Sequence, residues 1–285
     1  SKGNNTIQKD YFLPSLNLKY NLNDKNSLRL GASKTYTLPQ AKEISPYRYV
    51  GVNFNSQGNP NLKPSDHYNL DLKWDFNPTP TELISLTAFY KLIKNPISRI
   101  EVASAGGYLS YENIADKATV AGVEVEIRKN LFVRPVSNAA HGMNKLSLGL
   151  NGSYIYTNAK MPLATVTTGS QLEGAAPWIV NFDLSHNFTK GERSFVNTLV
   201  LNYVSDKIYT IGTQGYQDMM EKGVLTLDFV SQAKLNKHLS FNLKARNLLN
   251  PSYKLSRKAN ENGEKVILND YKKGINISLG VSCTF

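Results

Sequence analysis

The residues that could carry catalysis are few, and they form no known catalytic pattern. Asp71 and Asp75 share one face of a predicted strand, and a carboxylate pair can hydrolyse glycosidic bonds, but carboxylates are also common on any solvated strand face. The sequence contains no Gly-x-Ser-x-Gly elbow, phosphate-binding loop or HExxH pair. We therefore predict that the protein is not an enzyme and has neither a catalytic nor a metal site nor a cofactor. The histidines are scattered without the spacing of zinc ligands: His67, His141, His186 and His238.

Neither the single cysteine nor the net charge indicates a further function. Cys283 has no partner for an internal disulfide, and it falls on the apolar face of the last predicted strand. The formal net charge is +11, which could indicate a nucleic-acid partner. However, the basic residues are spread along the chain among Asp and Glu and form no stripe. We predict solvated faces, loops and contacts with lipid headgroups, and no nucleic acid.

The last stretch of the chain, 274–285, shows most clearly which type of secondary structure the polar and charged side chains belong to. Every odd residue from Ile275 to Phe285 is apolar, and every even one is small or polar. This period of two predicts a strand with one apolar and one polar face. The sequence contains no run of 18 apolar residues, so no transmembrane helix is predicted.

The same alternation recurs along the whole chain and predicts about eleven antiparallel strands. Their connections alternate between short turns and long loops, as in outer-membrane barrels. The long loops are 37–66, 157–176, 204–222 and 250–270. A longer turn is expected at 130–144, and the return strand at 195–203 has apolar residues on both faces.

Two further regularities separate a membrane barrel from a soluble sandwich. Charges are nearly absent from the apolar positions in the strand middles, where a Lys or Arg at the bilayer midplane would cost about 2 to 4 kcal/mol. Aromatic residues on the apolar face gather at the strand ends, as two membrane interfaces favour. On the short-turn side they are Tyr20, Phe76, Phe188 and Phe285, and on the long-loop side Tyr36, Tyr90, Tyr156 and Tyr203.

The odd strand number implies that the sheet does not close on itself. The first and last strands would run in the same direction, and two free edges in lipid would leave backbone groups unpaired. We therefore expect residues 1–285 to be the C-terminal portion of a larger antiparallel transmembrane barrel, about half of a 22-stranded one. The plug domain and the N-terminal strands would then lie outside this sequence.

Three motifs carry a resemblance to TonB-dependent outer-membrane receptors. The segment 58–64, Gly-Asn-Pro-Asn-Leu-Lys-Pro, resembles that family's GNP-x-LKP signature. Asn113-Ile114-Ala115 followed by Gly-Val-Glu-Val-Glu at 122–126 is similar to a second family strand, and Asn-Leu-Leu-Asn at 247–250 to a third motif. The matching positions are Gly58, Asn59, Pro60, Leu62, Lys63, Pro64, Gly122, Glu124, Glu126, Asn247, Leu248, Asn250 and Phe285, the last resembling the outer-membrane assembly signal.

The resemblance implies a function in transport. Such a receptor imports a small ligand, namely a metal chelate, glycan or peptide, across the outer membrane of a Gram-negative bacterium. The four long loops would face outside and capture the ligand with their Tyr, Asn and Gln side chains. The residues expected to face the barrel lumen are Asn69, Asp71, Lys73, Asp75, Glu124, Glu126, Arg128, Asn242, Lys244 and Arg246.

The partners implied by the resemblance are membrane and transport components. They are outer-membrane lipid, the remaining barrel strands and a plug, TonB through a segment outside this chain, and the assembly machinery through the C-terminal strand.

Three alternative functions stay open at this stage. A passive porin-like channel would have no plug. A soluble all-β binding module, such as a lectin sandwich, would give no reason for two aromatic rows. An outer-membrane enzyme would need a catalytic constellation at one rim, which this sequence does not supply.

Overall fold

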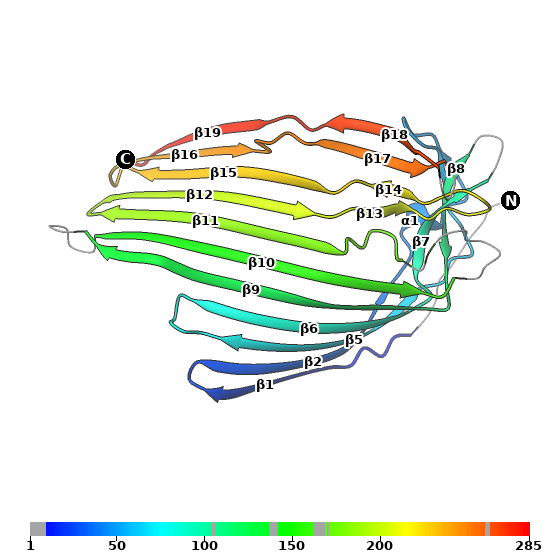
Figure 1. The fold of residues 1–285 in the computed structure, drawn as a ribbon, viewed down its shortest axis with the longest axis horizontal. Helices are drawn as coiled ribbons and strands as arrows, with labels where there is room; N and C mark the ends of the chain where they lie inside the picture. The colour runs from blue at the N-terminus through cyan, green and yellow to red at the C-terminus, as the bar shows by residue number, and fades with distance from the viewer. Residues whose placement is uncertain (1–9, 104–106, 137–141, 162–168, 170, 260–262) are drawn as a thin grey trace.

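The computed structural model describes residues 10–103, 107–136, 142–161, 169, 171–259 and 263–285. Eleven antiparallel strands form one long curved sheet (Figure 1), which confirms the expected strand number. In sheet order the strands are β1 (Ser15–Asn23), β2 (Asn26–Thr37), β5 (Ser65–Phe76), β6 (Leu83–Lys94), β9 (Lys117–Pro135), β10 (Met143–Ala159), β11 (Trp178–Lys190), β12 (Arg193–Val204), β15 (Val224–Lys234), β16 (Leu239–Arg246) and β19 (Asn276–Cys283).

Successive strands of this sheet are antiparallel, and short turns alternate with long connections between them. In two of these turns an Asn side chain satisfies the free amides. Asn23 Oδ1 accepts hydrogen bonds from the amides of Lys25 and Asn26, and Asn236 Oδ1 accepts them from His238 and Leu239. Within the described residues, β1 and β19 are the two edges of the sheet and do not pair with each other, so the sheet is open.

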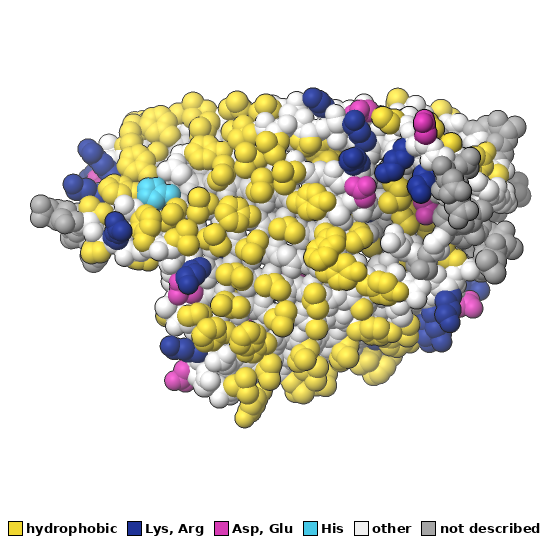
Figure 2. All heavy atoms as spheres, in the orientation of Figure 1, with side chains coloured by type: hydrophobic (Ala, Val, Ile, Leu, Met, Phe, Trp, Pro, Cys, Tyr) yellow, Lys and Arg dark blue, Asp and Glu magenta, His cyan; other side chains and the backbone are white. Residues whose placement is uncertain are grey.

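The alternating sequence gives this sheet one apolar and one polar face. Apolar side chains in the strand middles are about half exposed, such as Leu72 at 50%, Leu86 at 47% and Val123 at 46%. Figure 2 shows an apolar surface spread over the strands, with charged groups mainly toward its two ends. In water this surface would be strongly unfavourable, whereas lipid chains solvate it.

The predicted aromatic positions lie on this exposed apolar face. Toward the long-loop ends of the strands, Tyr36, Tyr90, Tyr156 and Tyr203 are 37% to 53% exposed. At the short-turn ends Tyr20 is 68% exposed, and Phe285 follows β19 near the marked C-terminus (Figure 1). The long-loop row, and Tyr20 and Phe285 at the opposite end, therefore lie where a membrane interface would place them. Within the described residues no helix is long and apolar enough to cross a bilayer.

The structure corrects two predicted connections. The turn expected at 130–144 is much shorter, because β9 continues to Pro135 and β10 begins at Met143. Three of the segments expected to be long loops, 37–66, 204–222 and 250–270, contain regular structure, because their backbone groups find partners in short strands. With β7 (Ile97–Val102) and β8 (Tyr108–Asn113), which come from outside the predicted loops, they form two four-stranded sheets and one short helix. One sheet has the order β3 (Arg48–Tyr49), β4 (Ser56–Gln57), β8 and β7, and the other β13 (Lys207–Thr210), β14 (Met219–Glu221), β17 (Ser252–Lys258) and β18 (Lys265–Lys272). The helix is α1 (Ala41–Ile44).

Candidate ligand-binding site

The two small sheets lie together at the long-loop end of the large sheet (Figure 1). We refer to them, with α1 and their connections, as the loop layer. Strand β7 joins them, since Ile100 forms a parallel bridge with Ile211. The amide of Ile211 donates to the Arg99 carbonyl at 3.0 Å, and the amide of Glu101 donates to the Ile211 carbonyl at 3.2 Å. Loops that are distant in sequence therefore share backbone hydrogen bonds at one strand.

An apolar cluster holds the loop layer against the ends of the large sheet. Its buried members come from β7, β13, the ends of β9 and β10 and the segments between them. They are Ile100, Ile114, Ala115, Ala118, Ala159, Leu172, Ile208 and Ile211. Because these side chains are at most 8% exposed, the loop layer has a packed core of its own and presents a preformed surface.

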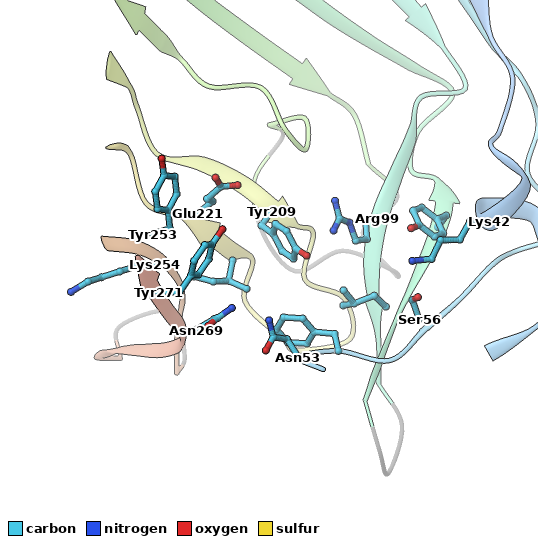
Figure 3. Close-up of a pocket in the computed structure, with 14 residues that line it drawn as sticks. Lys42, Asn53, Ser56, Arg99, Tyr209, Glu221, Tyr253, Lys254, Asn269 and Tyr271 are labelled. Atoms are coloured by element: carbon cyan, nitrogen blue, oxygen red, sulfur yellow. The ribbon is translucent and has the colours of Figure 1, made fainter. Parts of the chain in front are cut away.

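A cavity of about 600 Å³ lies in the loop layer (Figure 3). This volume is within the range of small-molecule sites, about 300 to 1,000 Å³. Tyrosines, amides and cations surround it, together with one carboxylate. The lining residues are Lys42, Asn53, Phe54, Ser56, Arg99, Leu109, Tyr111, Tyr209, Glu221, Tyr253, Lys254, Leu255, Asn269 and Tyr271.

Arg99 is the most firmly held cation of this cavity. Its Nη2 and Nε donate to Glu173 Oε1 at 2.8 and 3.2 Å, and its backbone amide donates to Glu173 Oε2 at 2.5 Å. The guanidinium lies over the Tyr209 ring, 4.3 Å from its centroid. Figure 3 shows Arg99 and Tyr209 side by side at the cavity. Fork geometry and ring stacking together fix the orientation of this side chain.

Burial and the ion pair shift the pKa values of Arg99 and Glu173 in opposite directions. Burial raises the pKa of the Glu173 carboxyl, and the hydrogen bonds from Arg99 only partly oppose this. Burial alone would lower the pKa of Arg99, but the charge of Glu173 and the Tyr209 hydroxyl outweigh it and raise that pKa. Burial also raises the pKa of the Tyr111 hydroxyl. Arg99 therefore stays charged at neutral pH and Tyr111 stays a neutral hydrogen-bond donor.

The other charged groups of the cavity differ in how far they are neutralised. Lys254 Nζ lies 3.5 Å from Asp270, and Glu221 lies 3.5 Å from Lys207 Nζ. Lys42 lies over the Tyr49 ring at 5.3 Å, and among the described residues no carboxylate forms an ion pair with it. The cavity thus has one cation, Lys42, that no carboxylate of the described residues balances, beside hydroxyl and amide donors.

The first two family motifs meet beneath this cavity. Asn113 Oδ1 accepts from the Lys63 amide at 2.8 Å, and its Nδ2 donates to the carbonyls of Lys63 and Asn95 at 3.0 and 2.9 Å. Asn59 donates through its side chain to the Tyr111 carbonyl at 3.0 Å and through its amide to the Glu43 carbonyl at 2.6 Å. These asparagines connect α1 and β8 to the start of β5. Three other motif residues, Pro60, Leu62 and Pro64, lie in the segment before β5, and Leu62 is buried there.

Two glycines of these motifs occupy places where a side chain would collide. A Cβ on Gly58 would lie 2.5 Å from the Lys42 carbonyl oxygen and 2.4 Å from that of Ser45, which belong to α1 and its end. A Cβ on Gly122 would lie 2.3 Å from the Tyr154 carbonyl oxygen and 2.4 Å from the Phe89 ring. In both places backbone oxygen, which cannot move aside freely, excludes a larger residue.

The third motif fixes the junction of β16 with β19. Asn247 and Asn250 both adopt positive φ, 57° and 43°, a conformation that Asn tolerates better than most residues. Asn247 Nδ2 donates to the Gly274 carbonyl at 2.7 Å, and Asn250 Oδ1 accepts from the Gly274 amide at 3.1 Å. Leu248 donates its amide to the Leu227 carbonyl at 2.8 Å. The motif therefore closes the connection that leaves and re-enters the large sheet.

The residues expected to face a lumen occupy the polar face of the large sheet. On β5, Asp75 is buried and lies 3.3 Å from Arg29 Nε and 3.5 Å from Lys73 Nζ. Asn69 donates to the hydroxyls of Ser33 and Thr35, both at 3.2 Å. Asp71 shares this face, next to Gly31.

The predicted residues of β9 also form a network on this face. Arg128 Nε donates to Glu126 at 2.8 Å, and Glu124 accepts from Asn151 Nδ2 at 2.7 Å. The hollow along β9, β10 and β11 has a volume of about 390 Å³ and is lined by polar side chains that include Glu126 and Arg128. Asn242, Lys244 and Arg246 occupy alternate positions of β16. That these faces line a lumen stays a prediction.

Sequence analysis identified only part of the cavity. Tyr209, Tyr253, Lys254, Asn269 and Lys42 come from segments that were expected to capture ligand. Arg99 and Tyr111 come from β7 and β8, which were not among those four loops. The sequence signal that could have identified Arg99 is its position as an arginine within the alternating stretch Ile97–Val102. The described residues contain no group of three or more His, Cys, Asp or Glu side chains arranged to hold a metal ion.

The comparisons with known proteins agree on one family. Residues 1–248 match the family model described as TonB dependent receptor-like, beta-barrel. The iron-regulated outer membrane virulence protein of Vibrio cholerae serotype O1 is 25% identical over 228 residues, which are 76% of this chain and 32% of that protein. The chain therefore spans about a third of the length of the curated relatives it matches.

Solved structures with similar folds include two receptors and a transporter. A mutant ferric enterobactin receptor from Pseudomonas aeruginosa, in complex with enterobactin, has a TM-score of 0.60 at 18% identity and covers 96% of this chain and 40% of that chain. The ferric yersiniabactin uptake receptor from Yersinia pestis has a TM-score of 0.60 at 16% identity, with 96% and 37% covered. The copper transporter OprC has a TM-score of 0.63 at 14% identity, with 94% and 39% covered. At these identities the likeness shows the fold alone.

Proposed function

Because this chain belongs to the TonB-dependent receptor-like β-barrel family, we propose that it forms part of the wall and outer mouth of a receptor that imports a small ligand. The family is one of transport receptors of the Gram-negative outer membrane. The ligand would bind at the loop-layer cavity, and energy delivered through TonB would drive its passage. No catalytic step is assigned to any residue.

The remaining parts of the receptor follow from the same proposal. The open edges β1 and β19 would pair with further strands, since unpaired edges are excluded from lipid. A plug would contact the polar face that carries Asp75, Glu124, Glu126 and Arg128. A segment outside this chain would bind TonB, and the C-terminal strand with Phe285 would be read by the assembly machinery.

The cavity favours an anionic chelate over a neutral ligand. The charge of Lys42, which no ion pair among the described residues balances, is the single observation that carries this choice. Tyrosine rings such as Tyr209 and Tyr271 supply flat apolar contacts beside hydroxyl donors, which suits an aromatic chelating group. Relatives are named for iron regulation and for ferric enterobactin, and a ferric catecholate has the required negative charge.

Uptake by cells that produce the full-length protein tests this function. We expect a radiolabelled ferric tricatecholate to accumulate, and accumulation to stop when TonB is deleted. Uptake that persists without TonB would instead identify a passive channel. A neutral ferric trihydroxamate serves as the comparison ligand, and its preferential uptake would refute the anionic ligand class while leaving transport intact.

A charge-removing variant tests the cavity itself. Lys42→Gln should weaken binding of the tricatecholate about tenfold, since a hydrogen bond to a charged group contributes about 1.5 kcal/mol or more and 1.4 kcal/mol is tenfold. Lys237→Gln removes the same charge from an exposed short turn at the opposite end of the sheet and should leave binding unchanged. Equal effects of the two variants would refute the cavity as the binding site.

A further inference from the structure

Four lysines lie on the apolar face of the large sheet, at its loop-layer end. On β2 and β6, Lys34 and Lys94 place their ammonium groups over the same ring, 5.6 and 5.3 Å from the centroid of Tyr68. Lys94 is paired in register with Lys117 of β9. Lys160 directly follows β10, which ends at Ala159. Ala159 is paired with Ala118 of β9, and Ala118 is the residue after Lys117 in the chain. We call Lys34, Lys94, Lys117, Lys160 and Tyr68 the lysine belt.

Register places the belt on the lipid-facing side. Lys34 lies opposite Tyr68, and Tyr68 lies opposite Leu92. Two residues further along the same face of β6, Tyr90 is 46% exposed, and Leu70 of β5 is 49% exposed. The belt therefore continues directly into the half-exposed apolar surface, at the row of tyrosines where the membrane interface is expected.

The belt carries more positive than negative charge. Asp66 lies opposite Lys94 in register, and Asp116 precedes Lys117 in the chain. No ion pair within the described part of the chain joins any of the four lysines to a carboxylate. In the loop layer, by comparison, Lys207 and Lys254 each have a carboxylate at 3.5 Å. What distinguishes the four belt lysines is their place on the apolar face, at the ends of β2, β6, β9 and β10.

We propose that the lysine belt binds the phosphorylated headgroup of a lipid in the outer leaflet. Lys34 and Lys94 approach Tyr68 from the strands on either side of β5, and a phosphate bound by belt lysines would offset the repulsion among their ammonium groups. Long lysine side chains at a membrane surface keep their charge at headgroup level while their stems lie on apolar surface. The adjoining apolar strands would contact acyl chains, so the site fits a molecule with both parts. Free phosphate would use only the lysines.

Lipid retention by the purified full-length protein tests this inference. The protein in neutral detergent is titrated with phosphatidic acid or with phosphatidylcholine of the same acyl chains, and bound lipids are counted by native mass spectrometry. We expect phosphatidic acid to bind the wild-type protein preferentially. Changing all four lysines to Gln should reduce its binding at least about fivefold, which corresponds to the effect of a single lysine near an anionic membrane surface.

A charge-matched control separates this site from general electrostatic attraction. Lys19→Gln, Lys25→Gln, Lys190→Gln and Lys237→Gln together remove the same charge from exposed positions near the short-turn end. This variant should retain phosphatidic acid. Equal loss in both quadruple variants would overturn the proposal, and so would equal binding of the two lipids by the wild-type protein.

Two further measurements keep the proposal testable if the quadruple variant fails to fold. Lys34→Gln with Lys94→Gln changes only the pair above Tyr68 and should still reduce phosphatidic acid binding. Inorganic phosphate at millimolar concentration should not displace the bound lipid, because it lacks the acyl contacts. Displacement by phosphate alone would show a site for a soluble anion and would overturn the assignment to lipid.

Discussion

Arg99→Ala should open the loop layer without disturbing the large sheet. The change removes two side-chain hydrogen bonds to Glu173 and the contact with the Tyr209 ring. It also leaves the Glu173 side chain, which is only 17% exposed, without its cation. Removing one partner of a buried pair costs about 3 to 5 kcal/mol. Because Arg99 is 27% exposed, we expect the lower end of this range, about 3 kcal/mol.

Hydrogen exchange of the full-length protein in detergent would measure this effect. The amides of Glu101 and Ile211 join the two small sheets, so they report opening of the loop layer. A loss of about 3 kcal/mol corresponds to roughly a hundredfold faster exchange, since every 1.4 kcal/mol is tenfold. Amides that pair β9 with β10 should keep their protection.

A second ion pair of the same length provides the control. Arg128 and Glu126 also lie 2.8 Å apart, but the Arg128 side chain is 69% exposed. Arg128→Ala should therefore cost less than about 1 kcal/mol. In the double variant of Arg99→Ala with Glu173→Gln, the unpaired charge is gone, and much of the lost protection should return. Additive effects of the two changes would refute the reasoning, because they would show that the buried charge is not what destabilises the single variant.

Three other predictions concern the motif glycine, the lipid face and pH. Gly58→Ala should prevent α1 from packing and weaken ligand binding more than tenfold, measured by titration with the ferric tricatecholate, because its Cβ would meet backbone oxygens at 2.4 and 2.5 Å. Leu72→Arg, at a half-exposed lipid-facing position, should cost about 2 to 4 kcal/mol of barrel stability in denaturant titrations in lipid, and Leu72→Ile should cost little. Since burial raises the pKa of Glu173 above its ordinary 4.5, the closed loop layer holds that proton more tightly than an opened one. Exchange protection of the Arg99 amide should therefore increase as pH falls from about 7 toward 4.5, and Glu173→Gln should abolish the increase. A decrease in protection would show that the charge of Arg99 outweighs burial.

The large sheet was predictable because one physical rule governs every strand of it. A strand between lipid and a polar interior must alternate, so even β12, with Val196 and Val200 on its polar face, could be placed from its apolar partners Leu199 and Leu201. The ends of β9 and β10 were missed because the polar residues Asn130 and Asn144 resemble turn formers. In the structure they continue the ladder, with Asn144 paired to Arg134.

The loop layer could not be predicted in the same way, because tertiary contacts determine its short strands. Strand β4 has two residues and pairs in parallel with β8 through Ser56 and Leu109, which lie far apart in the sequence. Arg99 gains its position from Glu173, another distant residue. No local period marks such pairs, so the sequence indicated most of the segments that form the loop layer but not which side chains meet at the cavity.

The family motifs and the cavity differ in what they determine. Asn59, Asn113 and Asn247 donate to or accept from backbone groups at junctions between loops and strands, and none of them lines the cavity. Such contacts fix where the loop layer is attached without specifying what it binds. The side chains that face the cavity, such as Lys42 and Tyr209, lie outside the motifs and can change without disturbing those junctions. A resemblance carried by the motifs therefore identifies the scaffold of the family, and a ligand must be established from the cavity.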